Sequence, residues 1–399
     1  MHTVGALRGV RGAVRIAVVA VGDPSNPALW SGTPSNIVRA LRETGAEVVT
    51  IDVRSRYDRM IIEADALPRV VSGLRRRGLR PGLDRERRVA QQSMLLSRAR
   101  SRRGQQLLDR SGPIDGVVQM GTGYTIGHPN VVSYEDMTVA QARAWPETFW
   151  GDVPAKMVEA RLQQQAAAYQ RNRGAAFSTS WAANSAVAQL GCPADKAHAV
   201  GIGLNFEVKV AEERDWSIPR FLFAGREWSR KNGPEVVAAF AEVRRSFPLA
   251  ELHLAGHHPV IEQPGVIDHG HLDLADPQDR DKMRALWAAA TCCVVPSRFE
   301  PAGIIYVEAM HAGIPSIGTT QGGAADLIGD AGVAIDPGDR AALIAAMREY
   351  CDPSVASAVG ARARRRGVQF TWANVASCLL HSLGFGGGTE PTTDKEYAL

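Results

Sequence analysis

Two glutamates stand eight positions apart in the stretch SRFEPAGIIYVEAMHAGIPSIGTTQGG. Glu300 comes just before a predicted helix, and Glu308 lies about two turns into it. The helix start itself consists of Gly303, Ile304 and Ile305. Carboxylates accept hydrogen bonds from hydroxyl groups, and the N–H groups of a helix start bind anions, so the spacing suits a ligand with hydroxyls at both ends and a phosphate between them. In the alternative interpretation, Glu300 only caps the helix and Glu308 is a solvated surface residue.

Two cations occur in the loop of FLFAGREWSRKNGPEVVAAF, between a predicted strand and a predicted helix. Arg226 and Lys231 follow the carboxyl end of that strand, in the same half of the chain as the two glutamates. Positive charge at this place can neutralise a diphosphate leaving group, because guanidinium and ammonium groups form strong hydrogen bonds with phosphate oxygens. For this loop taken alone, two solvated cations are the simpler interpretation.

Both groups belong to a chain in which strands and helices alternate. RIAVVAVGD is an apolar run typical of a strand buried on both faces, and SNIVRALRETG and EVVTIDV after it indicate a helix and a second strand. The alternation restarts at RFLFAGR, after a polar stretch at 211–217. Repeated strand–helix–strand units predict parallel sheets covered by helices, which bind ligands at the carboxyl ends of their strands. We therefore expect an α/β fold of two Rossmann-like open parallel-sheet domains that face each other across a cleft.

Composition restricts the class of protein. With 399 residues, 45% hydrophobic and 22% charged, the chain is long enough for two globular domains and differs from disordered and fibrous proteins. No apolar run reaches the roughly 18 to 20 residues that span a bilayer. The five cysteines form no CxxC pair and have no histidine at a zinc-like spacing. These features favour a reduced, cytoplasmic protein without a structural metal.

The net charge of +4 is distributed unevenly. The basic segment, Arg69 to Arg110, contains thirteen arginines against Asp84, Glu86 and Asp109, so it carries ten excess positive charges. Three interpretations stay open: a solvated arginine-rich face, a peripheral contact with an anionic membrane that carries a lipid acceptor, and a contact with nucleic acid or another polyanion. Few aromatic residues interrupt the arginines, which argues against stacking on single strands.

Together these segments resemble the retaining glycosyltransferases of the family 4 type (glycosyl transferases group 1), which have the GT-B fold. The matching elements are the E-x7-E spacing, the G-R-x4-K-x-G loop at 225–233, the strand LHLAGHHP and the stretch GIPSIGTTQGGAADLIGDAGVAIDPGD. The resemblance covers residues 14 to 383 and is more specific in the C-terminal half. It implies an acceptor-side domain at 1–205, a donor domain at 206–365 and a helix at 366–383 that crosses back to the first domain. The composition of 384–399 indicates a disordered tail.

The resemblance also implies a role for each matching residue. Arg226 and Lys231 would hold the donor diphosphate, Glu300 would face the donor sugar, and Glu308 would bind the ribose hydroxyls. Backbone groups at the helix start would contact sugar and phosphate. The implied reaction moves a hexose-type sugar from a nucleotide-diphosphate sugar, as co-substrate, to a hydroxyl of an unknown acceptor, with retention by front-face displacement. It requires no cofactor and no metal, and the D-x-D triplet at 279–281 is interpreted as charge at a helix start.

On the acceptor side, Gly32 and Thr33 after the first strand would close over the phosphates at a helix start. The chain departs from the family where many members carry a histidine–aspartate pair, since Glu135 and Asp136 occupy that position. His128 in the preceding loop is a third acceptor-side candidate. A carboxylate in place of an imidazole would alter acceptor orientation. The alternatives are therefore a non-catalytic or altered-activity GT-B protein, epimerase-like or a binding module, and a transferase for a polyanionic or nucleic-acid acceptor.

Overall fold

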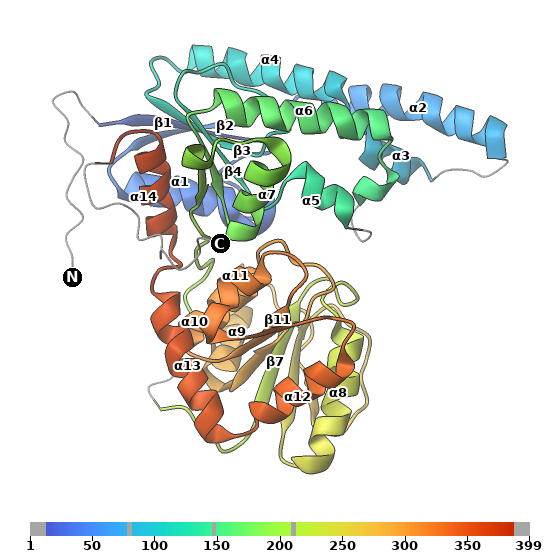
Figure 1. The fold of residues 1–399 in the computed structure, drawn as a ribbon, viewed down its shortest axis with the longest axis vertical. Helices are drawn as coiled ribbons and strands as arrows, with labels where there is room; N and C mark the ends of the chain where they lie inside the picture. The colour runs from blue at the N-terminus through green and yellow to red at the C-terminus, as the bar shows by residue number, and fades with distance from the viewer. Residues whose placement is uncertain (1–12, 78–81, 146–148, 209–212, 387–399) are drawn as a thin grey trace. The chain divides into compact units, whose positions relative to one another are not determined.

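The computed structural model describes residues 13–77, 82–145, 149–208 and 213–386. These residues form two compact units, shown as ribbons in Figure 1. Unit 1 comprises the described residues within Met1–Gly201 and Trp372–Leu399, and unit 2 those within Ile202–Thr371. The expected disordered tail at 384–399 lies outside the described residues from 387 onward, whereas residues 384–386 are described and Phe385 N–H donates to Leu380 O at 2.8 Å.

Unit 1 is built on a parallel six-stranded sheet with the order β2-β1-β3-β4-β5-β6. The strands are β1 (Arg15–Ala20), β2 (Glu47–Asp52), β3 (Gly116–Met120), β4 (Val131–Glu135), β5 (Gly174–Phe177) and β6 (Ala197–Ala199). β1 lies between β2 and β3, with Val18 opposite Thr50 and Val118. Residues 16–20 of β1 are at most 2% exposed, because helices cover both faces of the sheet.

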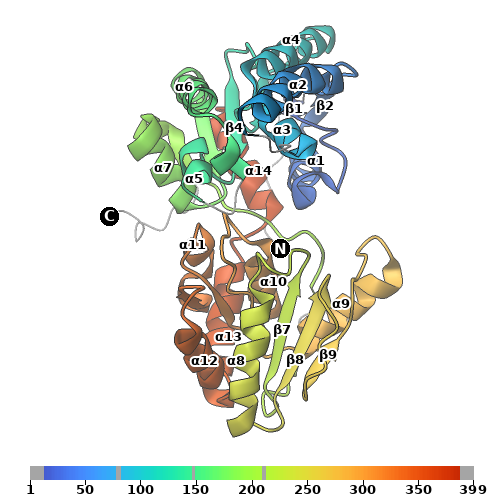
Figure 2. The same ribbon diagram turned by 90° about the vertical axis from the view of Figure 1, so that its right-hand side faces the viewer.

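The helices of unit 1 are α1 (Thr33–Glu43), α2 (Asp58–Arg77), α3 (Leu83–Ala90), α4 (Met94–Arg110), α5 (Val139–Ala144), α6 (Ala155–Arg171), α7 (Ser180–Leu190) and α14 (Trp372–Ser382). Leu108 of α4 packs on one face of the sheet with Ala17 and Val19. α14 packs against α1, as Figure 2 shows from the side. Asn130 and Arg173 donate hydrogen bonds to the carbonyls of Leu383 and Ser382, so the C-terminal helix is fastened to unit 1.

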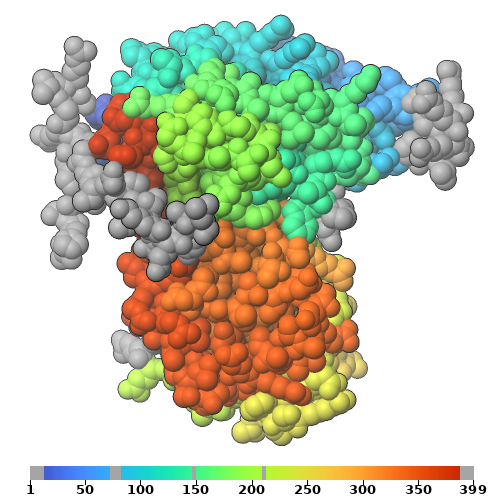
Figure 3. Space-filling model, in the orientation of Figure 1, coloured from blue at the N-terminus to red at the C-terminus, as the bar shows by residue number. Residues whose placement is uncertain are grey.

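Unit 2 repeats the plan with the strand order β12-β11-β10-β7-β8-β9, all parallel. Its strands are β7 (Arg220–Gly225), β8 (Glu251–Gly256), β9 (Val266–Asp268), β10 (Cys292–Val294), β11 (Ser316–Thr319) and β12 (Gly332–Ile335). Its helices are α8 (Gly233–Ser246), α9 (Pro277–Ala289), α10 (Ile304–Ala312), α11 (Ala324–Ile328), α12 (Arg340–Glu349) and α13 (Pro353–Gly367). Large side chains such as Trp287, Tyr306 and Phe240 are fully buried in one core. Figure 3 shows the closely packed atoms on the face in view.

The predicted fold class is confirmed in each unit, since both sheets are parallel and flanked by helices. The chain leaves unit 1 after Gly201 and returns to it at Trp372, close to the boundaries at 205 and 365 expected from the sequence. The short edge strand β6 was not predicted, because only three residues at the end of unit 1 form it.

The basic segment is helical in its described part and forms ion pairs with acids outside it. At 2.7 to 2.9 Å these pairs are Arg69–Asp65, Arg85–Asp152, Arg87–Glu63 and Arg100–Asp58. The stretch DVPAKM from Asp152 predicts a helix with an aspartate cap, but α6 begins after Pro154 without a side-chain cap. Folding therefore places four acids from outside the segment against it, and the local excess of positive charge is smaller than the sequence count.

Candidate donor site in unit 2

A buried ion pair lies beyond the carboxyl ends of the strands in unit 2. Lys231 Nζ contacts Glu300 Oε2, and the two side chains are 12% and 8% exposed. Arg230 Nη1 lies 3.5 Å from the same oxygen, and Ser297 Oγ donates a hydrogen bond to it at 3.1 Å. Burial alone would raise the pKa of Glu300, but the charges of Lys231 and Arg230 outweigh it and hold the pKa below its ordinary value.

Glycines at two adjacent strand ends make room for Lys231. A methyl group at Gly225 would lie 3.1 Å from Lys231 Cγ, so the lysine stem runs directly over the end of β7. Gly256, at the end of β8, has φ +135°, and a methyl group there would lie 1.9 Å from the carbonyl oxygen of Gly225. After Lys231, Asn232 is left-handed at φ 65° and donates a hydrogen bond to Pro337 O at 2.8 Å. This contact fixes the point at which α8 begins.

Gly256→Ala is expected to lower the free energy of unfolding by about 3 kcal/mol or more, because it adds a left-handed strain to a steric clash. The clash should also displace the loop that carries Lys231. Gly270→Ala is a matched control: Gly270 is left-handed at φ 63°, but a methyl group there meets nothing within 4 Å. Urea unfolding should show a loss of about 1 kcal/mol for the control. Equal losses in the two variants would contradict the close approach of β7 and β8.

The backbone around Glu300 is held by the loop after β11. Glu300 N–H donates to Gln321 O, and Gly323 N–H donates to Glu300 O, both at 3.0 Å. Gly322, between those two residues, has φ +110°, and a methyl group there would lie 2.1 Å from Glu300 O. Only glycine permits this approach, so the QGG stretch positions the carboxylate rather than serving only as a turn.

The start of α10 places its first N–H groups next to Glu300. Gly303 caps the helix at φ 98°, and a methyl group there would lie 2.5 Å from the ring of Tyr306. Tyr306 is fully buried and donates from its hydroxyl to Val295 O at 2.7 Å. The N–H groups of Gly303, Ile304 and Ile305 belong to the first turn, whose donors have no intrahelical acceptors. A helix start of this kind attracts an anion.

Glu308 lies about one turn along α10, not the two turns expected from the sequence, because the helix begins only at Ile304, and its side chain is partly buried. Burial raises its pKa to about 8, against an opposing effect of Lys231. Glu308 is therefore protonated at neutral pH and can both donate and accept a hydrogen bond.

The pKa of Glu308 makes stability depend on pH. The folded state keeps a proton that the unfolded state loses near pH 4.5, so this contribution is complete below pH 4.5 and is lost as the pH rises toward 8. Glu308→Gln cannot titrate, and its unfolding free energy should decline less between pH 5 and 8.5 than that of the wild type, by about 1 to 3 kcal/mol. Parallel stability curves for the two proteins would show that Glu308 is ionised in the folded state.

The structure distinguishes the two predicted cations and adds a third. Lys231 is engaged with Glu300, whereas Arg226 is exposed and makes no hydrogen bond or ion pair with the described residues. Arg230 was missed by sequence reasoning, although it donates to Phe299 O at 2.8 Å and faces Glu300. Its position next to Lys231 in the stretch SRKNG was the available signal.

In unit 1, the loop after β1 is strained just before α1. Trp30, Ser31 and Gly32 are left-handed in succession, with φ of 46°, 52° and 91°. Non-glycine residues rarely adopt this conformation, and it costs about 1 kcal/mol or more for each. Asn36 Nδ2 donates to Gly32 O at 3.0 Å, and Thr33 is buried at the first position of the helix. Gly32 and Thr33 thus lie at the carboxyl-end edge of the sheet of unit 1.

Glu135 ends β4 inside a cluster of neutral donors. Its carboxylate accepts hydrogen bonds from the Thr122 N–H and hydroxyl at 3.0 and 2.7 Å, from Gln165 at 3.1 Å and from the Tyr169 hydroxyl. Burial raises the pKa of Glu135, and these hydrogen bonds offset only part of that effect. The carboxylate therefore joins β4, the loop after β3 and α6. Asp136 follows it and is partly buried.

His128 lies at the opposite edge of the sheet. Its Nδ1 accepts a hydrogen bond from Asn130 N–H at 3.1 Å, and its Nε2 lies 3.1 Å from Ile114 O. The loop at 121–130 leaves the carboxyl end of β3 and returns to the amino end of β4, which separates His128 from Glu135 by the length of the strand. The structure therefore brings Gly32 and Glu135 to one edge but not His128.

The triplet at 279–281 lies in the first turns of α9, where Asp276 caps the helix. Asp279 pairs with Lys282 at 2.9 Å, and Asp281 pairs with Arg284 at 3.1 Å. Within the described ranges, no group of three His, Cys, Asp or Glu residues has a geometry that could hold a metal ion.

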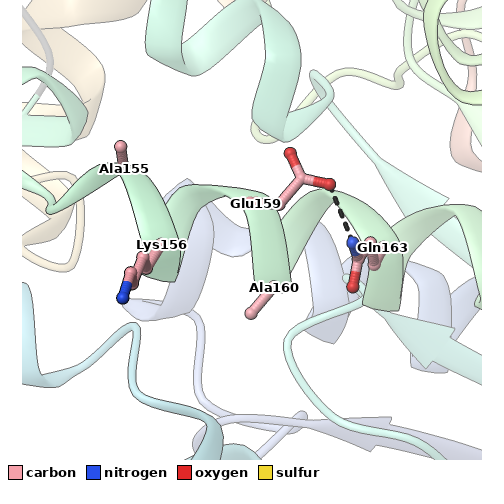
Figure 4. A pocket seen from close by; sticks show the side chains of 5 residues that line it. All are labelled: Ala155, Lys156, Glu159, Ala160 and Gln163. Atoms are coloured by element: carbon pink, nitrogen blue, oxygen red, sulfur yellow. Dashed lines mark hydrogen bonds between the residues drawn. The ribbon is translucent and has the colours of Figure 1, made fainter.

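A shallow depression runs along one face of α6 (Figure 4). It is lined by Ala155, Lys156, Glu159, Ala160 and Gln163, and Gln163 donates to Glu159 at 2.8 Å. Because every lining residue comes from one helix, no chemical groups converge there from a second element.

Comparison with known families finds a match within unit 2. Residues 218–352 match the family Glycosyl transferases group 1. The matched residues include Arg226, Lys231, Glu300 and Glu308, so the resemblance to glycosyl transferases group 1 is confirmed over 218–352.

Curated relatives match only part of the chain. A glycogen synthase of Mycobacterium tuberculosis is 32% identical over 173 residues, which cover 39% of this chain and 40% of that protein. An O-antigen chain mannosyltransferase B of Escherichia coli is 34% identical over 98 residues, or 24% of this chain and 26% of that protein. The chain thus spans less than half the length of either relative.

Solved structures share the fold over nearly the whole chain. A sucrose-phosphate synthase from Thermosynechococcus elongatus superposes with a TM-score of 0.63 at 17% identity, covering 91% of this chain and 96% of that one. A glycosyltransferase from Rickettsia africae gives a TM-score of 0.57 at 12% identity, covering 94% and 98%. The two parallel-sheet units and these neighbours establish the GT-B fold for this chain.

Proposed function

We propose that this chain is a retaining glycosyltransferase of the family 4 type, which transfers a hexose-type sugar from a nucleotide-diphosphate sugar to an acceptor hydroxyl. The observation that carries the proposal is the buried group formed by Lys231, Arg230 and Glu300 at the strand ends of the group 1 domain. It combines cations suited to a diphosphate with a carboxylate suited to sugar hydroxyls, beside a helix start.

Lys231 and Arg226 stabilise the leaving diphosphate in this mechanism. When the diphosphate takes Lys231 as its counter-ion, Glu300 is released to accept hydrogen bonds from the hydroxyls of the sugar. Arg226 is already exposed and without a partner among the described residues, so it reaches the phosphates without breaking an existing contact. Glu308 binds the ribose hydroxyls, and the N–H groups that begin α10 bind sugar and phosphate oxygens.

The acceptor hydroxyl attacks the anomeric carbon on the face from which the nucleotide leaves. The bond from that carbon to the phosphate oxygen breaks as the bond to the acceptor oxygen forms. The departing phosphate takes the acceptor's proton, so no side chain acts as a nucleophile. Positive charge from the protein replaces a metal in this scheme, and turnover is expected to survive EDTA.

Donor binding can be tested with a panel of UDP-, GDP- and ADP-sugars in a thermal shift assay. A tight donor stabilises the folded state by about 2.7 kcal/mol at a hundred times its Kd. We expect at least one donor to raise Tm and to release its nucleoside diphosphate on incubation. A donor that binds without release would support the alternative of a non-catalytic GT-B protein, and a panel without any binding would reject the donor site.

For the basic segment, we propose a peripheral contact with an anionic membrane, which suits a lipid-borne acceptor. Exposed apolar side chains favour a membrane over a polyanion: Met60, Leu67 and Leu95 are 62%, 52% and 60% exposed on α2 and α4. On α4, Leu95 shares a helix face with the exposed Arg98 and Arg102, which follow it by three and seven positions. Apolar groups beside basic ones suit a membrane interface. No helix in the described part of the chain is long and apolar enough to cross a membrane.

Sedimentation with vesicles of anionic or neutral lipid tests this contact. The protein should bind anionic vesicles at low salt, and Met60→Ser/Leu95→Ser should reduce binding several-fold. Leu249→Ser, which changes a 72% exposed leucine of unit 2, serves as the control. Binding to a DNA duplex in place of vesicles would favour the polyanionic acceptor instead.

A further inference from the structure

Five of the chain's ten histidines follow or belong to β8 and β9: His253, His257, His258, His269 and His271. Two of them form the inner pair, in which His253 Nδ1 lies 2.9 Å from His269 Nε2 and the ring planes are 7° apart. The side chain of His253 is 15% exposed, and His269 is partly buried. Burial and the neighbouring His253 lower the pKa of His269, so His269 is neutral at pH 7.

The inner pair can hold one added proton but not two. A neutral imidazole has one N–H and one lone pair, so one ring donates to the other when both are neutral. With one added proton on His253, its Nδ1–H still donates to His269, and its Nε2–H faces Glu251 Oε2 at 3.2 Å. A second proton gives both facing nitrogens an N–H. The hydrogen bond is then lost, and two like charges face each other.

The charged groups around the inner pair come from three strands and a helix. Glu251 of β8 attracts the pair but also accepts a hydrogen bond from Arg220 of β7 at 3.2 Å, and Arg220 lies 3.6 Å from Asp215. Asp268 of β9 favours protonation of the pair. Arg244 of α8 lies against the turn before β9. The two arginines offset part of the attraction of the acids, so the acids do not compensate a second added proton.

The other three histidines lie on the loops that continue the two strands. His257 and His271 form an exposed stack with ring centroids 4.3 Å apart, and Asp279 of α9 interacts with His271. Protonation of both rings adds a second repulsion between the loops. His258 acts in the opposite sense, because its Nε2 lies 3.2 Å from Asp268 Oδ1 and a protonated ring strengthens that contact. It keeps the loop after β8 near β9, so any separation of the strand ends stays local.

Two backbone hydrogen bonds join the ends of β8 and β9 beside the inner pair. His269 N–H donates to Leu254 O at 2.9 Å, and Gly256 N–H donates to Gly270 O at 2.8 Å. Gly256 in turn packs against Gly225, over which the stem of the donor-site lysine runs. A change at the inner pair can therefore reach the donor site through these contacts.

We propose that the inner pair is an acid-sensitive latch, in which a second proton breaks the bond between the rings and opens the two backbone hydrogen bonds beside it. The stability that the latch contributes is complete above pH 6.5 and is lost as the pH falls through the lower folded pKa of His269. The inference goes beyond the proposed function and needs no donor. It gives unit 2 a pH below which the lysine-bearing loop loses part of its support.

Hydrogen exchange followed by mass spectrometry at pH 7.5 and pH 5 tests the latch on the full chain without ligand. Protection factors, corrected for the intrinsic exchange rate at each pH, should fall at least tenfold at pH 5 in peptides that cover 252–256 and 266–270. Peptides that cover β1 and β2 of unit 1 should change less than twofold. Equal protection of the β8 and β9 peptides at the two pH values would overturn the latch.

His253→Gln and His269→Gln keep a polar side chain that cannot be protonated in this range. Each variant should reduce the tenfold pH effect to less than threefold. His381→Gln, which changes an exposed histidine on α14 of unit 1, should retain the full effect. A tenfold effect that persists in both inner-pair variants would assign the pH sensitivity to other groups and reject the latch.

NMR of the wild type with ¹⁵N-labelled histidine gives a reading that does not depend on the folding of a variant. Long-range ¹H–¹⁵N spectra should show that the two rings of the inner pair take up protons in separate steps, the second below pH 6.5. Titration of both rings in a single step near pH 6.5 would contradict the shared proton.

Discussion

In Lys231→Ala, kcat/KM for glycosyl transfer is expected to fall roughly 10² to 10³-fold, because the leaving diphosphate loses a preorganised positive charge. The loss should appear mainly in kcat, since negative charge develops on the phosphate as the bond to the sugar breaks. Steady-state release of nucleoside diphosphate measures both constants. Lys231 lies over Gly225 with its charge directed to Glu300, which is why removal of this one ammonium should have so large an effect.

Lys282→Ala is the matched control, since Lys282 is a 62% exposed lysine on α9 that pairs only with Asp279 in the described structure. Its turnover should equal that of the wild type. Arg226→Ala should lower the rate as well, without loss of stability, because Arg226 makes no contact that folding depends on. A Lys231→Ala protein with normal kcat would remove Lys231 from the mechanism.

Glu300→Gln is expected to lower the free energy of unfolding by about 3 kcal/mol, because it leaves Lys231 and Arg230 facing a neutral amide inside the protein. The stability loss should be greatest at neutral pH and smaller in acid, since the pKa of Glu300 is depressed in the folded state. A group with a depressed pKa stabilises the fold above its unfolded pKa of about 4.5, and this stability is lost as the pH falls through the folded value.

The double variant Lys231→Met/Glu300→Gln separates stability from function. Removal of both charges should restore part of the lost stability, because neither group then leaves an unpaired charge behind. Turnover should stay low in the double variant. Urea unfolding at pH 7 of the wild type, Lys231→Met, Glu300→Gln and the double variant measures the coupling energy between the two residues. Losses that simply add would show that Lys231 and Glu300 do not interact in solution.

Much of the fold could be predicted from the sequence, because buried parallel strands appear as short apolar runs between helical segments. RFLFAGR and AELHLAG correspond to β7 and β8, and EVVTIDV to β2. The three residues of β6 carry no such pattern, because an edge strand is only partly buried. The cap expected of Asp152 was wrong because a long-range ion pair with Arg85 competes with local capping, and spacing along the chain does not show such a partner.

The donor residues could be found from the sequence, but their contacts could not. Spacing indicated Lys231 and Glu300 as separate functional groups, whereas the structure joins them in a buried pair. Arg230 lies beside this pair because it donates to Phe299 O, 69 positions away, and such a distant partner is not shown by spacing along the chain. The sequence gives no basis for distinguishing Arg226 from Arg230. In the structure Arg226 is exposed, whereas Arg230 is partly buried.

On the acceptor side, the difference between what the sequence predicts and what the structure shows is greater. Glu135 was identified by its position after a strand, yet the number of neutral donors around it depends on residues 13 to 34 positions away. Arg161 of α6 is buried, yet it stands within a helix of good helix formers, where an arginine is usually solvated, so the sequence did not indicate its burial. The sequence count instead predicted a strongly positive basic segment. In the structure, four acids outside the segment neutralise part of that charge.

The most direct test of glycosyl transfer from the group 1 domain is the anomeric configuration of the first product. The wild type is incubated with the nucleotide sugar selected by the thermal shift panel, and ¹H NMR follows the anomeric proton before mutarotation. We predict a product with the configuration of the donor, formed in the presence of EDTA and absent with Lys231→Ala. A product of inverted configuration, or equal product from Lys231→Ala, would contradict the account.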